Sequence, residues 1–154
     1  MRDAAPVVMR AGELCIREVF TAQRGETISD IAKRMAERNV GDLVVVDDQD
    51  PRIPVGIITD RDLVVRVLAH GDRAPSEVTV GEVMSSEFVA VLEGDDLETV
   101  VSRLRLNAIR RIAVVDGEGY LQGIVSLDDI LEWIGAQVAT VTRLVERQLH
   151  VAAR

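Results

Sequence analysis

The sequence has few of the residues on which enzymes, disulfide frameworks and metal sites most often depend. Its single cysteine cannot form a disulfide within the chain, and no cysteine and histidine spacing matches a zinc site. No serine lies in the Gly-x-Ser-x-Gly pattern of a nucleophile elbow. The two histidines, His70 and His150, are far apart and are expected at helix ends on the surface. We therefore expect no enzyme activity, no catalytic cofactor and no bound metal.

Aromatic residues and long apolar runs are also scarce. Only 3% of the residues are aromatic, against 47% that are hydrophobic, so we expect an aliphatic core. No apolar stretch approaches the roughly 20 residues that cross a bilayer, and the N-terminus lacks a signal-peptide pattern. A net charge of −8 opposes binding to nucleic acid or to anionic lipid. The composition predicts a cytoplasmic globular protein with no nucleic-acid or membrane partner.

What the sequence does contain is an internal duplication. Residues 12–47 align with residues 81–116 at a constant offset of 69, without a gap. Identical pairs include Gly12 with Gly81, Glu13 with Glu82, Gly25 with Gly94, Arg34 with Arg103, and the Val-Val-Asp run 45–47 with 114–116. After two extra residues in the first copy, GIITDRDL at 56–63 aligns with GIVSLDDI at 123–130. Such self-similarity indicates two copies of one structural unit.

Each copy is predicted to contain a strand, a helix, two further strands and a second helix. Apolar residues in 27–38 recur at helical spacing, and Thr27 with Asp30 can form a capping box at the start. The apolar stripes are Ile28, Ile31, Ala32 and Met35 in the first copy and Leu97, Val100, Val101 and Leu104 in the second. The aliphatic runs 43–46 and 112–115 are typical of strands buried on both faces. The strands that follow are expected to end at Thr59 and Ser126.

These patterns divide the chain into a first repeat at 12–71, a linker at 72–80, a second repeat at 81–135 and a helical extension at 136–154. Toward the C-terminus an apolar stripe recurs at intervals of four, three and four residues, formed by Ile134, Val138, Val141 and Val145. Such a stripe suits packing against a partner helix. The alternative is that it packs back on its own repeats.

The ordered duplication resembles a tandem pair of cystathionine-β-synthase (CBS) domains, the arrangement called a Bateman module. The likeness covers roughly residues 12–133. It rests on the Gly-Glu-apolar-Cys/Met openings, the apolar-Val-Val-Asp strands and both Gly-apolar-apolar-Thr/Ser-x-x-Asp corners. It implies an α/β (α+β) fold in which two β-α-β-β-α repeats pack about a pseudo-two-fold axis, with an extended C-terminal helix. It also implies association into a homodimer.

In this family the corner aspartate accepts hydrogen bonds from both ribose hydroxyls of a nucleotide, and the preceding Thr or Ser contacts ribose or phosphate. Asp62 with Thr59, and Asp129 with Ser126, match these positions. A carboxylate suits a vicinal diol because its two oxygens accept two hydrogens at once. The alternative is that each corner is only a capping box for the helix that follows it.

The family's two clefts each combine the corner of one repeat with strands of the other. The first cleft would be lined by Thr59, Arg61, Asp62, Ala90, Val91, Ile109, Arg110 and Arg111. Its arginines would suit phosphate, and we expect one of Arg110 and Arg111 to be a phosphate ligand. The second cleft would be lined by Thr21, Ala22, Val40, Gly41, Asp42, Ser126, Leu127, Asp128 and Asp129. Because its added carboxylates repel phosphate, we expect the second cleft to bind weakly, to take a less charged adenosine compound or to stay empty.

The resemblance implies a stand-alone regulatory module that binds an adenine nucleotide, either AMP, ADP or ATP, with NAD and S-adenosylmethionine less favoured. Binding would change the angle between the repeats or the dimer surface, and a separate, unidentified effector protein would respond. The alternative is a ligand-independent scaffold or dimerisation protein, in which both corners serve only as helix caps.

Overall fold

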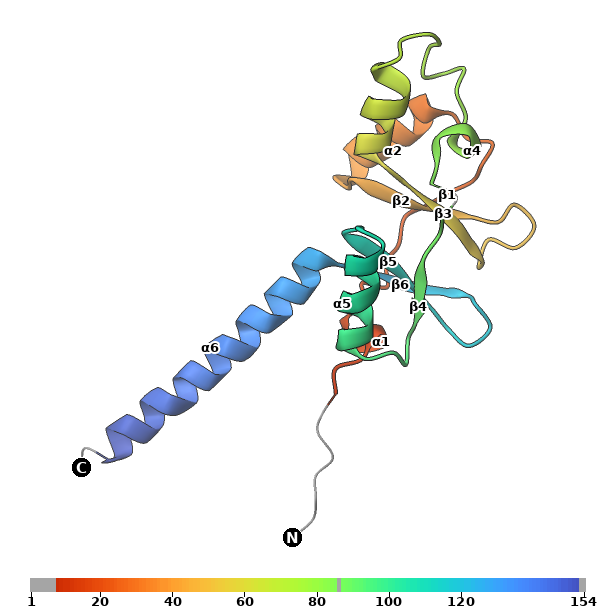
Figure 1. The fold of residues 1–154 in the computed structure, drawn as a ribbon. Coiled ribbons are helices and arrows are strands. Elements are labelled where there is room, and N and C mark those ends of the chain that lie inside the picture. The colour runs from red at the N-terminus through yellow and green to blue at the C-terminus, as the bar shows by residue number, and fades with distance from the viewer. Residues whose placement is uncertain (1–7, 86, 153–154) are drawn as a thin grey trace.

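The computed structural model describes residues 8–85 and 87–152, which form two small sheets with flanking helices and a long C-terminal helix (Figure 1). Each sheet has three strands, and each repeat supplies one sheet. The predicted mixed α/β fold is confirmed, including the order strand, helix, strand, strand, helix in both repeats.

The first repeat builds its sheet in the order β1-β2-β3. Its elements are β1 (Thr21–Ala22), α2 (Ile28–Arg38), β2 (Asp42–Val46), β3 (Pro54–Thr59) and α3 (Asp60–Asp62), which continues as the π-helix η1 (Leu63–Leu68). The first strand runs parallel to β2, and β3 runs antiparallel to it. The pairing places Asp42 beside Thr59, so the start of β2 meets the end of β3.

The second repeat follows the same plan in the order β4-β5-β6. Its elements are β4 (Ala90–Leu92), α5 (Leu97–Leu106), β5 (Arg111–Val115), β6 (Leu121–Ser126) and α6 (Leu127–Ala152). Arg111 lies beside Ser126, as Asp42 lies beside Thr59 in the first sheet. As predicted, β3 ends at Thr59 and β6 ends at Ser126.

The short helix that opens each repeat packs on the other repeat's sheet. Helix α1 (Ala11–Leu14) contributes the fully buried Ala11 to the second core, and Ile16 bridges to Ile124 of β6. Helix α4 (Val80–Val83) contributes both its valines to the first core, and Ser85 bridges to β3. The two sequence repeats are therefore interlocked, which ties the two sheets together.

The predicted helical stripes are confirmed for their central residues only. Ile28, Ile31 and Met35 of α2 are buried, and Thr27 caps the helix by accepting a hydrogen bond from the amide of Asp30. Ala32, which we predicted to be in the stripe, is exposed, because it lies at the rim of the face toward the sheet. In the second repeat Val100 and Leu104 are buried, Leu97 is half-buried and Val101 is exposed.

Helix α6 runs without interruption from the second corner to residue 152 and projects away from both sheets (Figure 1). Ile130, in its second turn, is buried in the second core, whereas Ile134, Val138, Val141 and Val145 are exposed. The alternative that the stripe packs back on its own repeats is therefore wrong. His70 is exposed in the turn after η1, and the side chain of His150 lies outside the described residues. No helix of the described chain has the length and hydropathy that crossing a membrane requires.

Candidate functional site

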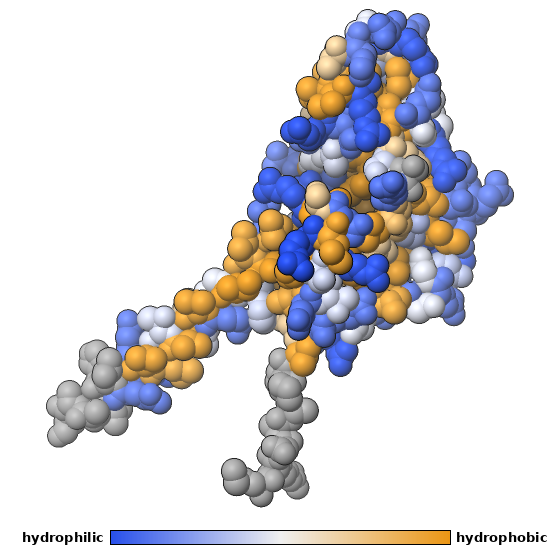
Figure 2. Space-filling model, in the orientation of Figure 1, coloured by the Kyte–Doolittle hydropathy of each residue, from blue (hydrophilic) through white to orange (hydrophobic). Residues whose placement is uncertain are grey.

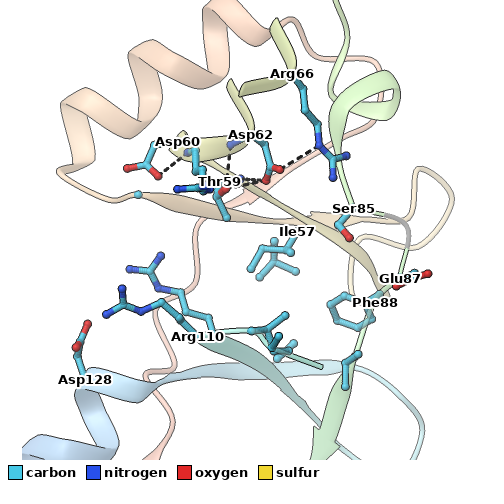
Figure 3. Close-up of a pocket in the computed structure, with 18 residues that line it drawn as sticks. Ile57, Thr59, Asp60, Asp62, Arg66, Ser85, Glu87, Phe88, Arg110 and Asp128 are labelled. Carbon is cyan, nitrogen blue, oxygen red and sulfur yellow. Dashed lines mark hydrogen bonds and ion pairs between the residues drawn. The ribbon is translucent and has the colours of Figure 1, made fainter. Parts of the chain in front are cut away.

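A cleft of about 710 Å³ lies between the two sheets and is lined by both repeats (Figure 3). Six of the residues predicted for the first cleft line it: Thr59, Arg61, Asp62, Ile109, Arg110 and Arg111. Two residues that we assigned to the second cleft, Gly41 and Asp128, line this one instead. Its volume is within the range of sites for small ligands.

The corner at the end of β3 holds the carboxylate of Asp62 in place. Its Oδ2 accepts hydrogen bonds from the amide of Thr59 at 3.0 Å and from the hydroxyl at 2.7 Å. In return, the Thr59 hydroxyl accepts from the amide of Asp62 at 3.2 Å. This reciprocal pair is a capping box for α3, so the capping interpretation is correct as geometry. It does not exclude a ligand, because a carboxylate has about four acceptor sites.

Arg66 lies beside the same carboxylate and was missed by the sequence analysis. Its Nε is 3.4 Å from Oδ1 of Asp62, and its Nη1 donates to the carbonyl of Val83 at 2.8 Å. The contact connects the corner to α4, the short helix supplied by the second repeat. The spacing of four residues between Asp62 and Arg66 was the available signal, since such residues are neighbours on a helix.

The three arginines predicted to line the first cleft are not equivalent. Nη1 of Arg111 is 2.8 Å from Oδ1 of Asp42 on the neighbouring sheet, which commits this guanidinium to a carboxylate. Burial raises the pKa of Asp42, Arg111 opposes that rise and Asp60 adds to it. Arg61 and Arg110 are exposed, and neither forms an ion pair with another described residue. These two arginines are the cations available to an anionic ligand.

The end of the cleft away from Arg110 combines apolar side chains with Ser85 and Glu87, which lie beside Phe88. Figure 3 shows Ile57 of β3 and Phe88, which precedes β4, facing the same space, while Arg110 lies toward the other end. Val44, Val89, Ile109 and Ala113 also line the cleft. The sequence analysis missed Phe88 because it precedes the strand on which we placed the lining.

Two residues predicted for the first cleft do not line it. Val91 is 3% exposed and packs in the second core, and Ala90 is half-buried at the start of β4. Both pair with β5, so their positions are set by the sheet and not by the cleft. The residues just before the strand, Phe88 and Val89, take their place.

The second corner repeats the hydrogen bonding of the first. Oδ2 of Asp129 accepts from the amide of Ser126 at 2.7 Å and from its hydroxyl, which accepts from the amide of Asp129 at 3.1 Å. Trp133 replaces Arg66 at the equivalent position, and Asp129 forms no ion pair in the described chain.

The strand residues predicted for the second cleft are mostly engaged elsewhere. Ala22 is buried in the first core, Val40 packs against that core, and Asp42 pairs with Arg111. The carbonyl of Thr21 accepts from Arg34, and Leu127 is exposed at the start of α6. Across the described residues, no group of three or more His, Cys, Asp or Glu side chains is placed to hold a metal ion.

Comparisons with known proteins agree with this architecture. An uncharacterized protein of Methanopyrus kandleri is 38% identical over 130 residues, which are 84% of this chain and 65% of that protein. A CBS domain protein of Pyrobaculum aerophilum, solved in complex with AMP, is 26% identical with a TM-score of 0.70, covering 79% of this chain and 89% of that one. A hexameric CBS-CP12 protein from bloom-forming cyanobacteria is 32% identical with a TM-score of 0.73, covering 82% and 68%.

The family assignment follows from the sequence match together with the duplicated fold. The family model of the CBS domain matches twice, at residues 11–69 and 80–136, which together exceed half of the chain. Each match contains one corner and one three-stranded sheet. The chain belongs to the CBS domain family and carries a tandem pair of CBS domains.

Proposed function

We propose that the cleft between the repeats binds an adenosine-containing ligand, with AMP, ADP and ATP as the leading candidates, and that its occupancy regulates a separate effector protein. The observation that carries the proposal is the corner of Thr59 and Asp62, which shares one cleft with two apolar side chains, Ile57 and Phe88, and with two exposed arginines, Arg61 and Arg110. The base of a nucleotide is weakly polar, its ribose carries two hydroxyl groups, and its phosphate is anionic. These three parts match the apolar side chains, the corner and the arginines in turn. The AMP complex of the Pyrobaculum aerophilum CBS protein supports the choice of ligand.

In the proposed pose the adenine ring lies between Ile57 and Phe88, and the ribose hydroxyls donate to Asp62. Stacking on an aromatic ring and burial against an aliphatic side chain both favour a flat, weakly polar base. The phosphate then extends toward Arg110 and Arg61, whose guanidinium groups bind phosphate oxygens in pairs. Oδ1 of Asp62 already forms an ion pair with Arg66. When the ribose hydroxyls donate to this oxygen, Arg66 either keeps its contact beside them or moves away.

The charges around the phosphate end favour a short tail. Asp60 and Asp128 line the same cleft as Arg61 and Arg110, so two carboxylates oppose the two available guanidinium groups. Each further ionised phosphate adds negative charge near these carboxylates. We therefore expect AMP to bind more tightly than ATP, with NAD and S-adenosylmethionine behind.

A scaffold without a ligand is the second candidate, and one observation favours it. Both oxygens of Asp62 already have partners within the protein, at Thr59 and Arg66. In this second candidate the contacts of Asp62 serve only to cap the helix and to hold Arg66.

The test is calorimetric titration of AMP, ADP, ATP, NAD and S-adenosylmethionine into the purified, nucleotide-free chain. The informative variant is Asp62→Asn, because the amide oxygen still accepts from Thr59 while the charge and one acceptor for the diol are lost. Asp129→Asn is its matched control at the other corner, and Phe88→Ala tests the base position.

Saturable AMP binding that Asp62→Asn weakens by about tenfold or more, and that Asp129→Asn leaves nearly unchanged, supports the proposal. Loss of binding in Asp129→Asn alone would place the ligand at the other corner. No heat with any ligand, from protein shown to be folded, would support the scaffold.

A further inference from the structure

The exposed face of α6 has a coiled-coil repeat. Leu131, Ile134, Val138, Val141 and Val145 follow one another at alternating intervals of three and four residues and are between 43% and 61% exposed. An average spacing of 3.5 residues keeps such a row facing one partner helix along its length. Figure 2 shows apolar side chains gathered along this projecting arm. We call these five residues the arm seam.

The middle of the arm is a weak helix former. Within 138–145, five of the eight residues are β-branched: Val138, Thr140, Val141, Thr142 and Val145. Such residues lose side-chain freedom in a helix, so this stretch has a low helix propensity. Burial of its apolar face against another surface would stabilise it, because most helical stability in proteins comes from such packing.

The charges along the arm permit pairing with a second copy of the chain. Between residues 134 and 145 the only charged residue is Arg143, which lies on the side of the helix opposite the seam. The residues flanking the seam, Gly135, Gln137 and Thr142, are uncharged. Two copies of a protein with a net charge of −8 can thus bring these faces together without like charges in contact.

We propose that the arm seam pairs with the arm seam of a second copy of this chain, as a two-helix coiled coil. Among the described helices only α6 has the repeat and the length, since α2 has 11 residues and α5 has 10. This pairing gives the homodimer expected of the proposed module a contact surface, the arm seam. It does not require a bound ligand. The family match ends at residue 136, so most of the seam lies beyond the CBS domains.

The experiment compares the mass of three full-length proteins by sedimentation equilibrium over a dilution series. Val138→Glu with Val141→Glu places two carboxylates in the seam. The matched control, Ala136→Glu with Ala139→Glu, adds the same charge to exposed positions outside the seam. We expect the wild type and the control to be dimers, and the seam variant to dimerise at least about tenfold more weakly because burying two carboxylates is unfavourable.

Three results would overturn the proposal: a monomeric wild type, a seam variant that dimerises as well as the wild type, or a control that is weakened equally. A monomeric wild type would point to another partner for the arm. Far-ultraviolet circular dichroism checks that each variant keeps folded CBS domains. Titration with AMP separates the two proposals, because loss of AMP binding in a protein that still dimerises through the seam removes only the proposed function.

Discussion

Asp42 of β2 and Arg111 of β5 form an ion pair of 2.8 Å that joins the two CBS repeats beside the cleft. Asp42 and Arg111 occupy equivalent positions in the two sequence copies. Their ion pair therefore lies where the two pseudo-symmetric repeats meet. The side chain of Asp42 is 14% exposed and that of Arg111 is 37% exposed. Arg111 therefore joins the two repeats through this pair, and it also lines the cleft in which we expected it or Arg110 to bind phosphate.

We predict that Arg111→Ala lowers the free energy of unfolding by about 1–2 kcal/mol, between the values typical of exposed and fully buried pairs. The reason is that the half-buried carboxylate of Asp42 loses its partner. Urea denaturation measures the change. Arg61→Ala, which removes an exposed arginine without an ion pair, should change stability by less than about 0.5 kcal/mol. Equal effects of the two substitutions would contradict this role for Arg111.

The pH dependence of stability should show the environment of Asp42. Burial raises the pKa of this carboxyl, so the folded state holds the proton more tightly than the unfolded chain does. Its stabilising contribution is present below the unfolded pKa and is lost as the pH rises through the folded pKa. The unfolding free energy of the wild type minus that of Asp42→Asn should therefore fall as the pH rises above the unfolded value of about 4. A difference that stays level or grows over this range would show that the carboxyl is not destabilised by burial.

Glu82 should show the opposite dependence. The amide of Thr79, followed by Arg73 and the Thr79 hydroxyl, lowers the pKa of Glu82 to about 2. Its stabilising contribution is present above the unfolded pKa of about 4.3 and is lost as the pH falls toward the folded value. The stability difference between wild type and Glu82→Gln should shrink over this acid range, and carbon-detected NMR should place the midpoint near 2. Glu98→Gln, at an exposed site on α5, is the control.

Close packing of the interlocked segments makes Gly123 sensitive to a single added methyl group. A Cβ at this position would lie 2.8 Å from the carbonyl oxygen of Ile16 and 2.9 Å from Cβ of Cys15. Gly123→Ala should lower the free energy of unfolding by about 1–3 kcal/mol, because the opening segment must shift.

The matched control for Gly123 is Gly135→Ala in α6, where a Cβ meets nothing within 4 Å. That substitution should raise stability by about 0.5–1 kcal/mol, since alanine is the better helix former. Thermal and urea denaturation report both changes. A tolerated alanine at Gly123 would mean that α1 is not held against β6 as the structure shows.

The cap at the start of α6 should contribute measurably to stability. Ser126→Ala removes the hydroxyl that accepts from the amide of Asp129 and should lower the free energy of unfolding by about 1 kcal/mol. Thr140→Ala also removes a hydroxyl from this helix, but that hydroxyl donates to the carbonyl of Ala136 within the helix and caps nothing. It should leave stability unchanged or slightly higher. If both substitutions destabilise alike, the cap has no special role.

The sequence by itself determined the features that depend on local interactions. The duplication, the order of strands and helices, the ends of β3 and β6 and both corner caps follow from spacing and hydrogen bonding within a few residues. Periodicity also located the stripe on α6, although it could not tell whether that stripe faces its own repeats or projects away from them.

Only the tertiary structure decided which distant segments meet. It placed α1 in the second core and α4 in the first, paired Arg111 with Asp42, and placed Phe88 in the cleft. These contacts join residues that are far apart in the chain, such as Cys15 and Gly123, and depend on shape and burial over both repeats at once. A pattern within one repeat carries no information about such contacts, because each half of the cleft is completed by the other repeat.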